Sequence, residues 1–83
     1  MANDQPRVLV VEDEPSQLEV LAYNLEAEGF AVSRARDGEE ALLLLSEDAP
    51  VIIVLDWMMP NISGIEVCRQ IKTKPETRSI PVI

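Results

Sequence analysis

Length, composition and charge restrict the class of this protein before any motif is considered. With 83 residues the chain holds at most one domain, and because a chain of roughly 60 residues buries only about 60% of its unfolded surface, its stability should be marginal. The hydrophobic content of 47% excludes a disordered chain, and one Trp, one Tyr and one Phe leave an aliphatic core. The net charge of −8 argues against nucleic-acid binding by this chain and favours cations as ligands.

The cysteine count and the apolar runs indicate the compartment. A single cysteine excludes an internal disulfide and fits a reducing environment. The first six residues are polar, and no apolar run approaches the length of a membrane span. We therefore expect a cytoplasmic protein that does not contact the membrane.

The chain begins with a strand followed by a helix. Residues 7–11 form an apolar run typical of a strand buried on both faces, and acids occupy positions 12–14. Pro15 suits the first turn of a helix, where Ser16 and Glu19 have the spacing of a capping box. We therefore expect a helix to start at this point.

A second strand and a second helix follow. Gly29 supplies the stop of the first helix, and residues 30–35 are typical of a short strand near a sheet edge. Asp37 should cap the second helix, with Glu40 at the box position. Helical spacing predicts a buried side for each helix: Leu18, Leu21, Ala22 and Leu25 in the first, and Ala41, Leu42, Leu44 and Leu45 in the second.

The central stretch is the run of five apolar residues at 51–55, which ends abruptly on Asp56. An uninterrupted and mostly β-branched run predicts a strand buried on both faces of a parallel sheet. A loop with Pro and Gly at 57–64 should lead into a third helix that runs to about residue 71. The expected apolar positions of that helix are Ile65, Val67, Cys68 and Ile71.

The end of the chain contains a polar link at 72–79 and an apolar run at 80–83, which we expect to begin a fourth strand. The scattered bases near the third helix, Arg69, Lys72, Lys74 and Arg78, most simply form a solvated face. Strands that alternate with helices predict an α/β fold with three layers, in which a doubly wound parallel sheet lies between helices. Because the sequence stops inside an apolar run, we expect this fold to be truncated after the start of strand four.

Acidic residues follow two strands of the predicted sheet. Glu12 and Asp13 follow the first strand and Asp56 follows the third, so these side chains should meet at the edge where ligands of such sheets bind. Clustered carboxylates repel one another unless a cation intervenes. Mg²⁺ prefers oxygen ligands and leaves positions for a phosphoryl oxygen, and an ionised Asp beside it can carry an aspartyl phosphate.

The acid pair 12–13 and the stretch 56–64, which reads Asp-x-x-Met-Pro-x-x-x-Gly, resemble the receiver domain of bacterial two-component response regulators. The resemblance covers almost the whole chain and implies a flavodoxin-like strand order. It implies that Asp56 accepts phosphate from a sensor histidine kinase. It also implies that Asp13 binds Mg²⁺ directly, that Glu12 binds it mainly through water, and that Met58 binds it through its backbone carbonyl. We expect Asp56 to be a metal ligand as well.

The departures from the family pattern are also informative. The resemblance requires a Ser or Thr after strand four and a Lys after strand five, and residues 1–83 contain neither. Helix four, strand five and helix five are also absent, so we interpret 1–83 as about the first two-thirds of a receiver. Val51 replaces the Asp that commonly precedes strand three.

Other interpretations remain open on the sequence alone. Asp56 could be a turn residue and Asp13 a helix cap, whereas Cys68 is best explained as core. The chain could instead be a non-signalling fragment that self-associates, since an unfinished sheet edge and an uncovered helix face favour a homo-oligomer. An aspartyl phosphatase is disfavoured because Met58 stands where such enzymes have a second Asp, and flavin binding is disfavoured because no phosphate loop follows strand one. Whether the chain has enzymatic activity, such as autodephosphorylation, stays undecided.

Overall fold

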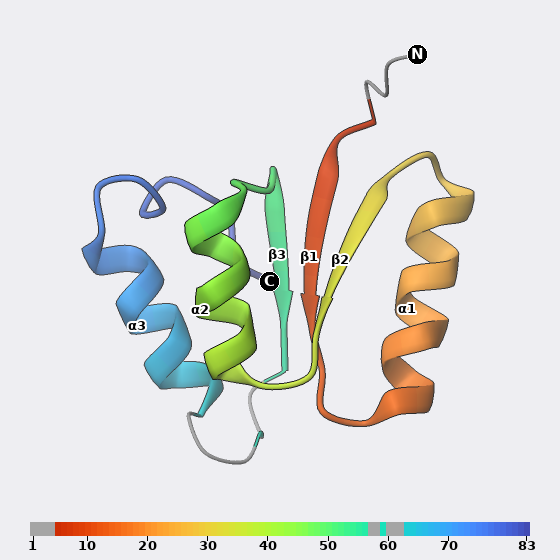
Figure 1. Cartoon of the computed structure of the whole chain (residues 1–83), viewed down its shortest axis with the longest axis horizontal. Helices are drawn as coiled ribbons and strands as arrows, with labels where there is room; N and C mark the ends of the chain where they lie inside the picture. Colours follow the sequence, from red (N-terminus) through yellow and green to blue (C-terminus); the bar gives the residue numbers. More distant parts are fainter. Residues whose placement is uncertain (1–4, 57–58, 60–62) are drawn as a thin grey trace.

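The structure, a computed structural model, is described for residues 5–56, 59 and 63–83. Its elements are β1 (Arg7–Val11), α1 (Pro15–Ala27), β2 (Ala31–Ala35), α2 (Gly38–Glu47), β3 (Ile52–Leu55) and α3 (Gly64–Thr73). The strands form a parallel sheet in the order β2-β1-β3. Helix α1 covers one face of the sheet, and α2 and α3 cover the other (Figure 1). The predicted three-layer doubly wound fold is therefore confirmed.

The central strand β1 supplies the middle of the core. Its residues Val8, Leu9, Val10 and Val11 are all at most 2% exposed. Since side chains alternate along a strand, Val8 and Val10 pack toward α1, whereas Leu9 and Val11 pack toward α2 and α3. Burial on both faces, as predicted for this run, is confirmed.

The same prediction is wrong for β3. Ile53 and Leu55 are buried against α2 and α3, but Ile52 and Val54 on the opposite face are only partly buried. The reason is the position of α1, which packs on β1 and β2 and leaves this face of β3 incompletely covered. Val51 lies outside the strand and is 52% exposed.

Helix α1 does not begin with the predicted capping box. Glu14 is the N-cap, and its carboxylate accepts hydrogen bonds from the Gln17 amide at 3.1 Å and from the Ser16 hydroxyl. Pro15 fixes the first helical position, so Ser16 falls inside the helix, and Glu19 pairs with Arg34 instead. The predicted stripe is confirmed: Leu18 and Ala22 are buried, and Leu21 and Leu25 are partly buried.

Helices α2 and α3 also begin with side-chain caps. The Asp37 carboxylate accepts a hydrogen bond from the Glu40 amide at 2.8 Å, as predicted, and the Ser63 hydroxyl caps α3 in the same way at 3.2 Å. The predicted apolar position Ile65 is wrong, because that side chain is 62% exposed. The buried face of α3 consists of Gly64, Val67 and Ile71, with Cys68 partly buried beside it.

The segment after α3 returns to the sheet beside β3. The buried Thr77 hydroxyl donates to the Ile71 carbonyl at 2.7 Å, and the Lys72 ammonium donates to the carbonyls of Arg78 and Ile80. Lys72 therefore stabilises the segment after α3 through these hydrogen bonds rather than only contributing to a solvated face. The expected fourth strand is present as one parallel bridge between Ile53 and Val82.

Candidate metal centre

The carboxyl ends of all three strands point to the same edge of the sheet (Figure 1). The Asp56 amide donates to the Val11 carbonyl at 3.0 Å, which fixes the end of β3 beside the end of β1. On the other side, the Glu12 amide donates to the Ala35 carbonyl at 3.0 Å and holds the start of the acidic segment against β2. These backbone contacts bring the predicted acids to one place.

The side chains of Glu12, Asp13 and Asp56 offer carboxylate oxygens that all lie within 4.8 Å of one another, and each residue is partly buried. Oxygens bound to one Mg²⁺ lie at most about 4.2 Å apart, since each bond is about 2.1 Å long. A small approach of the side chains would therefore bring them to the distances of a magnesium site. Three carboxylate donors with partial access to water suit a hard cation that keeps some of its hydration.

The electrostatics of Glu12 agree with this arrangement. Burial raises the pKa of the Glu12 carboxyl above its usual value, and the charges of Asp56 and Asp13 and a hydrogen bond with Asp56 raise it further. The Glu14 amide, which donates to Glu12 at 3.3 Å, opposes this increase. A bound cation would relieve the repulsion among these groups.

The residues that flank the three acids do not all have the roles expected from the sequence. Glu14, not Asp13, caps α1, so the interpretation of Asp13 as the helix cap is wrong. Gly64 is buried at the first position of α3. Met58, which was expected to contribute its carbonyl, lies outside the described residues, as do Trp57 and Pro60.

The sequence did not identify Arg36 as a residue beside this acidic edge of the sheet. Arg36 follows β2 directly, and with Asp13, Asp37 and Glu40 it lines an open hollow beside the acids. Its amide donates to the Glu40 carboxylate at 2.8 Å. The only signal in the sequence was its position after a strand that neighbours β1.

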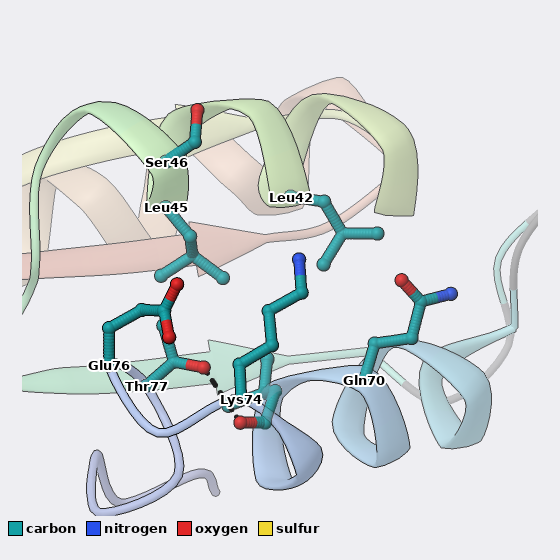
Figure 2. Close-up of a pocket in the computed structure, with 8 residues that line it drawn as sticks. Leu42, Leu45, Ser46, Gln70, Lys74, Glu76 and Thr77 are labelled. Carbon is teal, nitrogen blue, oxygen red and sulfur yellow. Dashed lines mark hydrogen bonds between the residues drawn. The ribbon is translucent and has the colours of Figure 1, made fainter.

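A separate cavity of about 60 Å³ lies between α2 and the segment after α3. Leu42 and Leu45 of α2 form one wall, and Lys74 extends toward them from the far side (Figure 2). This cavity lies at the end of α3 that is remote from Gly64, so it is not part of the acidic edge. Among the described residues, no helix is long and apolar enough to cross a membrane.

Comparisons with known proteins agree on one family. The family described as "Response regulator receiver domain" matches residues 8–83. The phosphate regulon transcriptional regulatory protein PhoB of Rhizobium meliloti is 49% identical over 78 residues, which are 94% of this chain and 34% of that protein. The response regulator PleD of Caulobacter vibrioides is 47% identical over 77 residues, 93% of this chain and 17% of that protein. The chain thus spans 34% and 17% of the lengths of these two relatives.

Solved structures give the same result. The receiver domain of a signal transduction histidine kinase from Syntrophus aciditrophicus has a TM-score of 0.89 and 40% identity, over 93% of this chain and 58% of that one. The response regulator TrrA of Thermotoga maritima, in complex with Mg²⁺ and BeF, has a TM-score of 0.82 and 40% identity, over 87% and 63%. From the family match, the relatives and the fold together, this chain belongs to the receiver domains of two-component response regulators.

Proposed function

We propose that the chain is a phosphoacceptor that receives a phosphoryl group on Asp56 from a sensor histidine kinase, with Mg²⁺ as cofactor. The observation that carries this proposal is the gathering of Glu12, Asp13 and Asp56 within 4.8 Å. Family membership and the Mg²⁺ and BeF complex of TrrA support it.

The proposed roles are those that the resemblance to receiver domains implies. One carboxylate oxygen of Asp56 forms the new bond to phosphorus while the bond from phosphorus to the donor imidazole nitrogen breaks, and that nitrogen keeps the electron pair. Asp13 would bind Mg²⁺ directly, Glu12 through water and Met58 through its carbonyl. Mg²⁺, when bound, would neutralise the charge that develops on the phosphoryl oxygens.

A titration with Mg²⁺ tests the metal site, with the fluorescence of Trp57, the one tryptophan in the sequence, as the reporter. We expect a saturable change that is lost in the double variant Asp13→Asn with Asp56→Asn. Glu47→Gln is the matched control, because it removes one exposed charge at the last residue of α2 and should leave the titration unchanged. A response that persists in the double variant would remove the proposed site.

Intact mass then tests phosphoryl transfer. After incubation with acetyl phosphate and Mg²⁺, we expect a species heavier by one phosphoryl group in the wild-type chain and none in Asp56→Asn. The yield should be low, because residues 1–83 lack the Lys that the resemblance assigns to charge stabilisation. Equal labelling of both chains would show that Asp56 is not the acceptor.

We further propose that the 83-residue chain forms a homo-oligomer, because part of its apolar surface is uncovered. The bridge at Val82 joins β3, and Ile83 beside it is 69% exposed. Ile52 and Val54 add partly buried apolar surface on the face of β3 that α1 leaves incompletely covered. Size-exclusion chromatography with light scattering should give a mass above 9.2 kDa, whereas a folded monomer at high concentration would contradict this proposal.

A further inference from the structure

A single arginine shares the hollow beside the acidic edge. Among the residues that line this hollow, Arg36 is the only base, and Asp13, Asp37 and Glu40 are acids. The backbone beside Arg36 is fixed, since the Ala35 carbonyl accepts from Glu12 and the Arg36 amide donates to Glu40. The exposed Arg36 side chain therefore starts from a defined position next to the proposed metal ligands.

Two of the three acids in the hollow already have partners. Asp37 accepts from the Glu40 amide and Glu40 accepts from the Arg36 amide, both at 2.8 Å, so each carboxylate caps the start of α2. Within the described residues, no ion pair to the Arg36 guanidinium is found. The guanidinium therefore remains available to an anion that enters the hollow.

We propose that Arg36 is a positioning residue for the phosphodonor: its guanidinium attracts the donor phosphate to the metal edge and, by the same charge, weakens Mg²⁺ binding. This inference rests on the proposed function. A guanidinium suits phosphate because its donors form a planar fork that matches two phosphate oxygens. It opposes Mg²⁺ because like charges at one edge repel, more strongly at low salt.

The variant Arg36→Ala should bind Mg²⁺ more tightly but accept phosphate more slowly. By Trp57 fluorescence at low ionic strength, its Kd for Mg²⁺ should fall about twofold to fivefold, and the difference should shrink at 0.5 M KCl, where the Debye length is only about 4 Å. At saturating Mg²⁺, its rate of phosphorylation by acetyl phosphate should fall about threefold to fivefold, the size of one exposed charged contact. Arg36→Lys should recover part of both effects.

The control and the contrary outcomes separate this inference from the proposed function. Arg78→Ala removes an exposed base from the link after α3 and should change neither the Kd for Mg²⁺ nor the rate of phosphorylation. If Arg36→Ala lowers both metal affinity and rate, Arg36 is structural and the inference fails while the proposed function stands. If the wild-type chain binds Mg²⁺ but Asp56 takes no phosphate, the proposed function fails and the donor role of Arg36 fails with it. An unchanged Kd in Arg36→Ala overturns the electrostatic role in either case.

Discussion

The raised pKa of Glu12 makes a stability prediction. Because the folded state favours the protonated carboxyl, the contribution of Glu12 to stability is fully present below the ordinary pKa of 4.5 and is lost as pH rises through the folded pKa. In urea unfolding without Mg²⁺, Glu12→Gln should therefore gain stability relative to wild type as pH rises from 4.5 toward 7.

Glu66 provides a control of opposite sign. Hydrogen bonds from Arg69 and Gln70 lower the pKa of Glu66, so its contribution is present above the ordinary pKa and is lost as pH falls. Glu66→Gln should therefore lose stability relative to wild type as pH rises toward 4.5, and the difference should change little between pH 5 and 7. If Glu12→Gln followed the trend of Glu66→Gln, or showed no trend, burial and repulsion at the acidic edge would not raise the pKa of Glu12 in the folded chain.

The residues of the site differed in how far they could be predicted. The meeting of Asp56 with Glu12 and Asp13 could be predicted because each follows a strand, and parallel strands end at one edge. The cap of α1 could not, because Ser16 and Glu14 compete for the start of one helix and only the backbone decides. Arg36 was missed because a base after a strand has no spacing rule that marks it.

At the scale of the element, the end of α1 carries a sharp prediction. Gly29 has φ of +99°, and the amides of Gly29 and Phe30 donate to the carbonyls of Glu26 and Leu25, which is a Schellman motif. A Cβ at Gly29 would meet nothing within 4 Å, so only backbone strain opposes a side chain. Gly29→Ala should therefore cost about 1 kcal/mol in the free energy of unfolding.

Urea unfolding measures this cost, and two further variants interpret it. Gly29→Asn should lose less than Gly29→Ala, because Asn tolerates the left-handed region better. Glu28→Ala, at the neighbouring exposed position with a φ of −90°, should change stability by less than about 0.5 kcal/mol. A neutral Gly29→Ala would mean that the chain leaves α1 by a different turn.

The elements themselves were predicted more reliably than their burial. The hydrophobic pattern gave the three helices and the first three strands to within two residues or so, because each helix carries a capping or glycine signal at one end and the strands are short apolar runs. Burial of Ile52 and Val54 was overestimated because it depends on which strands α1 covers, and that depends on the packing of the whole sheet. The expected fourth strand is only one bridge between Ile53 and Val82. Its extent could not be predicted because the pairing of strands depends on the packing of the whole sheet and not on the local sequence.

At the scale of the whole molecule, we expect a net charge of −8 and an acidic edge to make folding sensitive to Mg²⁺. An ion that binds only the folded chain stabilises it by about 1.4 kcal/mol at ten times its Kd. For a domain of this size, that corresponds to an increase in Tm of about 6–11 °C.

A matched ionic-strength control separates site binding from general screening, because NaCl screens the net charge without occupying the acidic edge. Thermal unfolding with MgCl₂ should therefore exceed unfolding in NaCl of equal ionic strength by this increase in Tm. The excess should vanish in Asp13→Asn with Asp56→Asn, although removal of two repelling charges should by itself raise the Tm of that variant without metal. Equal Tm values in the two salts for the wild-type chain would mean that the three carboxylates stay together without a bound ion, and the case for a magnesium-dependent receiver would then have to rest on family membership alone.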